Sequence, residues 1–475
     1  MQPADPNLDP GASMPRGNLS DALFTDLYEL TMAQAYWQSG MTADATFSLF
    51  FRTYPPDRAY FVFAGLADAL EHLEGFRFSG GDISHLRAGK RFDGDFLSYL
   101  QELRFTGSVR AMHEGAIAFA GEPVLEVTAP VIEAQLLETF LINQINLQTV
   151  LATKASRVVH AAQGKSVVDF AARRTHGIEA SARLARLSYM VGFAGTSNAL
   201  AGGIYGIPTF GTMAHSFITA FDDEAEAFRA YAKAFPDTST FLVDTYDTVE
   251  GVRNAIAVAK EMLQRGNALQ AIRLDSGDLR DLAKTARAML DEAGLEAVRI
   301  FASGGLDELA VEELVRWGAP IDGYGVGTKV GVSADAPWAD CVYKMVTYDA
   351  RPVLKLSGDK ATLPGPKQVF RRCDTGGRYA ADVVACASEP PPAGATALLQ
   401  EVMLNGEALA RPLSLRHLRE RFAEHFERLP EEHKELRSPA AYDVRVSDAL
   451  EELRRRLTDE AARRQSATGG ASYRE

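Results

Sequence analysis

Polar or glycine residues follow each of six short apolar segments in the middle of the chain. In chain order, these groups are Asp169 with Arg173-Arg174, then GTMAH (211–215), DTYD (244–247), RLDSGD (273–278), SGG (303–305) and GVGT (325–328). Arginine offers a planar pair of donors to carboxylate or phosphate, carboxylates bind ribose hydroxyls or hydrated Mg²⁺, and glycine lets the backbone approach an anion. Gathered at one place, these groups suit a magnesium-bound diphosphate.

The last two groups predict a phosphate site. They consist of Ser303-Gly304-Gly305 and of Gly325-Val326-Gly327-Thr328. The helix after each loop would offer free N–H groups and the positive end of its dipole, and barrels commonly hold phosphate between their final two loops. Each loop alone is also compatible with a tight turn that needs glycine. As a terminal pair they favour phosphate binding.

Arg273 and Asp275 are expected to face the same side, because residues two apart on a strand point the same way. Arg273 suits a carboxylate or a phosphate, and Asp275 with Asp278 could bind ribose hydroxyls or hold Mg²⁺ through water. Asp244, one strand earlier, adds a carboxylate to the same rim. The alternative interpretation is a salt bridge at the edge of the sheet.

For two further groups, a functional interpretation depends more on position in the fold than on residue type. His215 follows a predicted strand and stands beside Thr212 and Ser216, but one histidine among nine indicates little by spacing alone. Arg173 and Arg174 could be ordinary surface charge. At the end of a barrel strand, one of the two would be a natural clamp for a carboxylate.

Short apolar segments alternate with amphipathic helices from about residue 145 to 326. Strands are predicted over 165–170, 207–212, 240–243, 269–274, 298–302 and 321–326, with helices over 178–192, 217–235, 248–265, 279–293 and 306–317. This alternation is typical of βα units and a parallel sheet. So many consecutive units favour a (β/α) barrel over a doubly wound sheet, and a barrel gathers all strand ends at one mouth.

The regions on either side of this alternating segment have a different pattern of predicted elements. A strand is expected over 45–52, a helix over 65–75, short strands over 108–129, and more strands after Val342 that pair back onto the N-terminal region. The predicted organisation is a disordered leader (1–20), an N-terminal α/β domain (21–143), a catalytic barrel (144–341), a C-terminal segment packing on the N-terminal domain (342–455) and a tail (456–475). The region after Arg371 suggests no function.

Composition excludes several classes of protein. The net charge of −13 opposes binding to nucleic acid or to an anionic membrane surface, and 46% apolar residues suffice for a globular core. No segment approaches the roughly 18 apolar residues of a membrane-spanning helix. Three cysteines without a C-x-x-C pair make a poor disulfide framework or zinc site. We therefore expect a cytoplasmic protein.

Eight strings resemble nicotinate phosphoribosyltransferase in sequence and in order. They are TDLYELTMAQAYW (25–37), FAARR (170–174), GTMAHSF (211–217), VDTYDT (243–248), RLDSGDL (273–279), SGGL (303–306), GVGT (325–328) and PGPKQVFR (364–371). SGGL is a weak signal, whereas GTMAHS and RLDSGDL are more specific. The resemblance extends from about Asp21 to about Arg371. The chain lacks the four cysteines of family members with a C-terminal zinc ribbon, so no zinc is expected.

The resemblance implies an irregular α/β barrel with an N-terminal α/β domain completed by C-terminal strands, in a homodimer with shared active sites. It implies that nicotinate and 5-phosphoribosyl 1-diphosphate give nicotinate mononucleotide and diphosphate with Mg²⁺, in NAD biosynthesis by salvage. ATP hydrolysis would be coupled through a phosphorylated histidine.

Matched position by position, the resemblance assigns roles to residues of this chain. His215 would be phosphorylated, and Tyr28 would come from the partner subunit to stack on the nicotinate ring. The remaining roles are nicotinate contact by Thr212 and Arg273, carboxylate or diphosphate binding by Arg173 or Arg174, ribose or magnesium binding by Asp244 and Asp275, and 5-phosphate binding by Gly304, Gly305, Gly327 and Thr328.

Three alternatives are open. Nicotinamide phosphoribosyltransferase has the same fold, although Arg173-Arg174 and GTMAHS favour the acid. Quinolinate phosphoribosyltransferase shares the barrel but decarboxylates a diacid without ATP. A non-catalytic regulator that binds a phosphometabolite is a third possibility, but a sensor need not keep His215, Asp275 and both glycine loops.

Overall fold

Six parallel strands form the sheet that carries the predicted site. The computed structural model describes residues 19–356, 362–411 and 413–469. The strands are β6 (Ser166–Asp169), β7 (Gly195–Thr196), β8 (Thr240–Leu242), β9 (Ala271–Leu274), β10 (Arg299–Ala302) and β11 (Gly323–Val326). Their order is β7-β6-β11-β10-β9-β8. The last strand along the chain, β11, therefore pairs with the first, β6. That pairing is the mark of a barrel, because it returns the chain to its starting strand.

The barrel is irregular at one place. Among the described residues, β7 and β8 do not pair with each other, and the strand predicted over 207–212 is reduced to a single bridge between Thr196 and Thr209. Pro208 has no N–H to donate, and glycines at 206 and 211 weaken a strand, so a longer ladder is not expected there. The predicted barrel fold is confirmed, with this opening as its irregularity.

The helices of the βα units follow the predicted pattern with one difference. They are α7 (Ile178–Met190), α8 (Ala199–Tyr205), α9 (His215–Ile218), α10 (Glu224–Ala234), α11 (Thr248–Gln264), α12 (Leu279–Glu292), α13 (Glu308–Arg316) and α14 (Thr328–Gly331). The single helix predicted over 217–235 was wrong, because Asp223 caps α10 by accepting a hydrogen bond from the Glu226 amide. That cap begins a new helix and separates it from α9.

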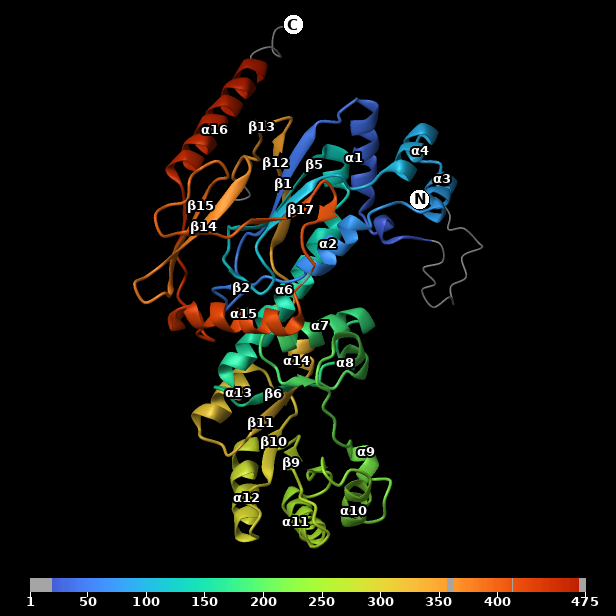
Figure 1. Ribbon diagram of the computed structural model, residues 1–475, viewed down its shortest axis with the longest axis vertical. Helices are drawn as coiled ribbons and strands as arrows, with labels where there is room; N and C mark the ends of the chain where they lie inside the picture. Colours follow the sequence, from blue (N-terminus) through green and yellow to red (C-terminus); the bar gives the residue numbers. More distant parts are fainter. Residues whose placement is uncertain (1–18, 357–361, 412, 470–475) are drawn as a thin grey trace.

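A second sheet combines the two ends of the chain. Its seven antiparallel strands have the order β13-β12-β1-β5-β3-β17-β18. The N-terminal strands β1 (Asp44–Phe51), β3 (Ser108–Ala111) and β5 (Pro123–Pro130) form its centre. The C-terminal strands β12 (Cys341–Tyr348), β13 (Arg351–Pro352), β17 (Gln400–Leu404) and β18 (Glu407–Ala408) flank them on both sides (Figure 1). The expected completion of the N-terminal domain by C-terminal strands is confirmed.

Further elements surround this sheet. They are η1 (Asp21–Leu23), α1 (Leu27–Gln38), β2 (Phe61–Val62), α2 (Leu66–Glu74), α3 (Gly80–Ala88), α4 (Gly94–Glu102), β4 (Ile117–Ala118), α5 (Val131–Gln135), β14 (Lys367–Cys373), β15 (Tyr379–Cys386), β16 (Thr396–Ala397), α15 (Leu415–Arg428), η3 (Glu431–His433), β19 (Val444–Val446) and α16 (Asp448–Gly469). Helix α15 reaches the barrel, where Arg419 donates hydrogen bonds to the carbonyls of Tyr189 and Gly192 at the end of α7.

Helix α6 (Glu138–Ala161) joins the two hydrophobic cores. Its 24 residues make it about 36 Å long, enough to pass from the N-terminal sheet to the barrel (Figure 1). Leu141 and Ile145 in its first half pack in the N-terminal core, and Ala155 and Val158 in its second half pack in the barrel core. The two parts of the molecule therefore share one buried helix.

Candidate active site

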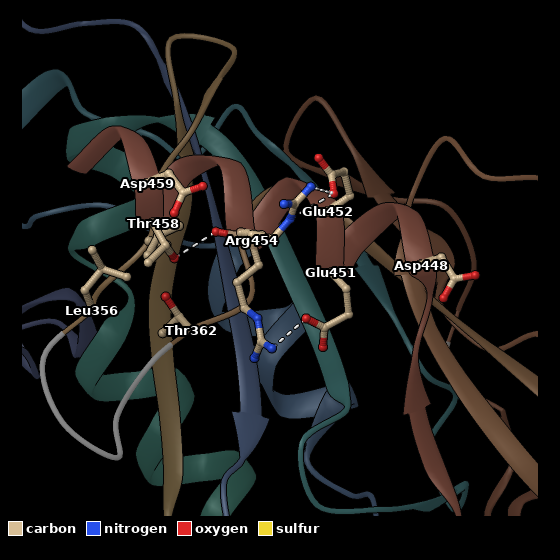
Figure 2. Close-up of a pocket in the computed structure, with 10 residues that line it drawn as sticks. Leu356, Thr362, Asp448, Glu451, Glu452, Arg454, Thr458 and Asp459 are labelled. Atoms are coloured by element: carbon tan, nitrogen blue, oxygen red, sulfur yellow. Dashed lines mark hydrogen bonds and ion pairs between the residues drawn. The ribbon is translucent and has the colours of Figure 1, made fainter. Parts of the chain in front are cut away.

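A cavity beside α16 and the ends of the barrel strands differ in whether their charged groups are already paired. A cavity of about 540 Å³ lies against α16 (Figure 2). Its arginines are already paired within the helix, Arg454 with Glu451 and Arg455 with Glu452, each at 2.5 Å. Helix α16 also lies far from the barrel (Figure 1). The ends of the barrel strands, in contrast, carry polar atoms that lack partners.

Three neighbouring strand ends are tied together by their side chains. The Asp244 carboxylate, after β8, accepts hydrogen bonds from the Asp275 amide at 2.9 Å and from the Ser276 hydroxyl at 2.5 Å. The Ser303 hydroxyl, after β10, donates to the Asp275 carboxylate at 2.5 Å. The structure thus brings Asp244, Asp275 and Ser303 together, as the converging strand ends predict.

The loop that spans the opening between β7 and β8 joins the same group. Arg273 donates a hydrogen bond to the Thr212 hydroxyl at 2.5 Å. Nδ1 of His215 lies 3.1 Å from the Thr245 hydroxyl, and Nε2 lies 3.9 Å from the Asp275 carboxylate. Side chains therefore close the barrel mouth where backbone pairing is missing.

Two buried polar atoms at this mouth have no hydrogen-bond partner among the described residues: Oδ1 of Asp244 and Nε of Arg273. Nearly all buried polar groups in proteins are hydrogen-bonded, and a ligand or an ion at the mouth would supply the missing partners of these two atoms. Burial lowers the pKa of the Arg273 guanidinium, and Arg173 nearby lowers it further, whereas Asp275 and Asp244 oppose the shift. An arginine remains charged despite such a shift.

The two glycines of the SGG loop serve different purposes. Gly304 has a φ of +90°, and a β-carbon there would lie 1.8 Å from the Asp275 carbonyl oxygen. Only glycine can therefore bring this loop against Asp275. Gly305 has a φ of +66° with no atom within 4 Å of an added β-carbon, so it faces open space. In the other loop, a β-carbon on Gly327 would approach the Phe170 carbonyl oxygen to 3.0 Å, next to Thr328 at the start of α14.

The arginine loop is shaped by a buried carboxylate. Asp169, at the end of β6, accepts hydrogen bonds from the Ala171 amide at 2.8 Å and from the Thr196 hydroxyl at 2.7 Å, and burial raises its pKa. Arg173 and Arg174 follow this turn with exposed side chains, and their guanidinium groups bond to no other described residue. A cavity of about 420 Å³ adjoins the loop, between it and the start of α8. Its size suits a small ligand.

The side chains of three predicted residues make no hydrogen bond to this group. Tyr28 stands on α1 in the N-terminal domain, away from α9 (Figure 1), where burial and a hydrogen bond to Glu138 raise its pKa. Asp278 accepts hydrogen bonds from the amides of Arg280 and Asp281 as the N-cap of α12. Ser216 is exposed on α9, and its side chain bonds to no other described residue.

Sequence reasoning missed the partners that orient the predicted residues. Thr245 contacts His215, and Ser276 contacts Asp244. Both stand inside strings that carried the prediction, but a string does not indicate where a hydroxyl points. Within the described part of the chain, no three His, Cys, Asp or Glu residues are arranged to hold a metal ion. The helices described there include none that is long and apolar enough to span a bilayer.

An irregular parallel barrel, with its polar strand ends at one mouth, defines an α/β-barrel enzyme. Three family models match the chain: the nicotinate phosphoribosyltransferase N-terminal domain at residues 23–146, the nicotinate phosphoribosyltransferase family at 165–345, and its C-terminal domain at 392–454. The chain belongs to the nicotinate phosphoribosyltransferase family.

Individual relatives agree with this assignment. The nicotinate phosphoribosyltransferase pncB2 of Mycobacterium tuberculosis is 50% identical over 431 residues, covering 90% of this chain and 92% of its own length. The enzyme of Bacillus subtilis is 44% identical over 358 residues, covering 74% and 73%. The crystal structure of human nicotinic acid phosphoribosyltransferase superposes with a TM-score of 0.81 at 31% identity, covering 91% and 99%.

Proposed function

We propose that this protein is a nicotinate phosphoribosyltransferase, which forms nicotinate mononucleotide and diphosphate from nicotinate and 5-phosphoribosyl 1-diphosphate. The product serves NAD biosynthesis by salvage. The observation that carries the proposal is the 50% identity to an enzyme of this name over nine-tenths of the chain. The unsatisfied Asp244 and Arg273 atoms at the barrel mouth support it independently.

The reaction is substitution at the anomeric carbon of ribose. Departure of diphosphate leaves an oxocarbenium-like carbon, so the site must neutralise the leaving group and hold the ribose in line with the ring nitrogen. The pyridine nitrogen of nicotinate carries its own lone pair, so no enzyme base is needed. Asp244 and Asp275 bind the ribose hydroxyls, and Gly304, Gly305, Gly327 and Thr328 surround the 5-phosphate in this proposal.

The nicotinate ring and its carboxylate need different contacts. Thr212 and Arg273, already joined by a hydrogen bond, lie at the mouth where the ring would bind. Arg173 or Arg174 binds the carboxylate or the diphosphate, since both guanidinium groups are exposed and uncommitted. Ser216 and Ser303 complete the set of substrate contacts that we propose.

Magnesium fits the donors at this mouth. Oδ1 of Asp244 is buried without a partner, and the Asp275 carboxylate lies on the next strand end. Two carboxylates with water and a diphosphate are ligands that Mg²⁺ prefers. Asp278 is a weaker candidate, because its carboxylate already caps α12. Bound there, the ion would neutralise charge on the leaving diphosphate.

ATP is the proposed co-substrate, and His215 is the proposed phosphoryl acceptor. A phosphoryl group on its ring would place a dianion beside Asp275 and the diphosphate site. This addition would shift the loop between states of different substrate affinity, so that ATP cleavage drives the condensation. The contacts of both ring nitrogens support a loop position that phosphorylation can change.

A homodimer with shared sites is part of the same proposal. Helix α1 and the segment before it expose apolar side chains at Phe24, Leu27 and Tyr28, and the barrel mouth exposes Leu200 and Phe210. Exposed apolar patches of this kind mark protein interfaces. Pairing the two patches between subunits would bring the partner subunit's Tyr28 onto the nicotinate ring.

One assay tests this function: formation of the mononucleotide from nicotinate or nicotinamide, with and without ATP. We expect turnover of nicotinate that increases with ATP. Strong preference for nicotinamide would replace this proposal with nicotinamide phosphoribosyltransferase. Absence of both product and ATP hydrolysis with both substrates present would instead favour a phosphometabolite-binding regulator.

A further inference from the structure

An ion pair joins the two glycine loops. Nζ of Lys329 lies 2.6 Å from Oδ2 of Asp307, with the lysine side chain 44% exposed and the aspartate 17% exposed. Asp307 stands two residues after Gly305, and Lys329 directly follows Thr328. Each partner is therefore attached to one of the loops that surround the proposed 5-phosphate site.

Asp307 is held from both sides. Besides the lysine, it accepts a hydrogen bond from the Ala310 amide at 2.9 Å as the N-cap of α13. Burial alone would raise the pKa of this carboxyl, but the bonds from Lys329 and Ala310 leave it below its ordinary value. The carboxylate is thus ionised at neutral pH, and the start of α13 is fixed to α14.

A buried lysine also joins the same two segments. Nζ of Lys154, on α6, lies 2.5 Å from the Glu308 carboxylate and 2.6 Å from the Asp335 carboxylate. Glu308 begins α13, and Asp335 follows α14. Lys154 is 2% exposed and shares these carboxylates with Arg58, 2.8 Å from Asp335, and Arg157, 3.0 Å from Glu308. Removing Lys154 would unbalance a buried charge network and endanger the fold. The more exposed pair, Asp307 with Lys329, is therefore the one that can be tested.

We propose that Asp307 and Lys329 are positioning residues for the phosphate of the phosphoribosyl substrate. This inference rests on the proposed function. Two loops that donate to one phosphate must keep their spacing, because N–H···O hydrogen bonds need donor–acceptor distances of about 2.7–3.2 Å and favourable angles. The ion pair fixes that spacing. Asp307 neutralises the ammonium of Lys329, so the lysine acts through the loops and does not itself bind the phosphate.

The test measures binding of ribose 5-phosphate by calorimetry. Asp307→Asn keeps a good N-cap and removes the charge, and Lys329→Met removes the other partner. Each variant should bind ribose 5-phosphate about tenfold more weakly, and the double variant should be no worse, because coupled residues do not contribute additively. KM for 5-phosphoribosyl 1-diphosphate should rise in parallel, while kcat and KM for nicotinate stay unchanged. Lys329→Arg should restore binding.

Arg229→Met provides the matched control. It removes an ion pair of similar exposure, between Arg229 and Glu261, that joins α10 to α11 away from the glycine loops. Its affinity for ribose 5-phosphate should equal that of the unchanged protein. A loss of affinity in this control as large as in Asp307→Asn would overturn the inference, because any barrel ion pair would then have the same effect.

Other outcomes separate the inference from the proposed function. If Lys329→Met abolishes binding while Asp307→Asn preserves it, the lysine is a phosphate ligand and the inference is wrong. If both variants bind like the unchanged protein, which still forms the mononucleotide, the inference fails and the function stands. If the unchanged protein forms no mononucleotide but the variants lose ribose 5-phosphate binding together, the positioning role stands without the proposed function.

Discussion

Residues from two other strand ends lie near the His215 ring. Thr245, after β8, contacts Nδ1, and Asp275, after β9, lies 3.9 Å from Nε2. Because Thr245 contacts Nδ1, the orientation of the ring does not depend on the four-residue helix α9 alone. A phosphoryl group on Nδ1 would displace the Thr245 contact, whereas one on Nε2 would lie beside the Asp275 carboxylate.

Replacing His215 with alanine should separate ATP hydrolysis from product formation. We expect His215→Ala to form nicotinate mononucleotide slowly, at a rate that ATP does not increase, because no phosphoryl acceptor remains. The measurement is the rate of mononucleotide formation with and without ATP. His85→Ala, which alters an exposed histidine of α3, should keep the full response to ATP. A His215→Ala protein that ATP still accelerates would exclude this residue as the acceptor.

At the residue scale, the sequence predicted which residues gather and missed how they are held. Asp244, Asp275 and Ser303 meet because each follows a strand of one parallel sheet, and that rule needs no side-chain geometry. The bond between Thr245 and His215 joins residues 30 positions apart, and its existence depends on the path of the loop across the barrel opening. The path of that loop cannot be predicted from a local sequence pattern.

At the scale of elements, the barrel is regular except where proline and glycine interrupt it. The strands β6, β8, β9, β10 and β11 lie within their predicted ranges, because alternating apolar segments and amphipathic helices encode them locally. The segment around Pro208 was predicted as a strand from its apolar residues, and the missing N–H donor explains why it makes only one bridge. The short strand β7 and helix α8 were missed.

The SGG loop offers a test of how one glycine positions the Asp275 carboxylate. Gly304→Ala should lower stability by about 3 kcal/mol, because its β-carbon collides with the Asp275 carbonyl and its φ is positive. Gly294→Ala has a similar φ of +74° but open space around it, so about 1 kcal/mol is expected. Thermal unfolding of both variants measures the difference. Equal losses would show that Asp275 does not depend on this contact.

At the scale of the whole molecule, the proposed stacking of Tyr28 on the nicotinate ring is a matter of assembly. Tyr28 lies on α1 in the N-terminal domain, away from α9 (Figure 1), so the proposed role requires that a second subunit supply it. The sequence resemblance predicted this arrangement, and nothing in the residue pattern of one chain could have located the partner. Interfaces between copies depend on surface shape, which local patterns do not encode.

Mixing two inactive variants tests the shared site. Tyr28→Ala and Arg273→Ala should each be inactive as homodimers. After subunit exchange, half of the dimers contain one subunit of each kind and one intact site, so about a quarter of full activity should return. Activity of the mixture is the measurement, with co-purification of two different tags as evidence of exchange. Exchange without recovered activity would place both residues in the same subunit's site.

The N-terminal sheet has a consequence for synthesis of the chain. Its three central strands, β1, β3 and β5, are complete once about 130 residues have been made, but their edge partners begin only at Cys341. During the intervening translation, both edges of the sheet expose unpaired backbone groups that invite aggregation. The barrel, made entirely in that interval, can fold first. The nascent chain must therefore protect an unfinished sheet while a finished barrel emerges after it.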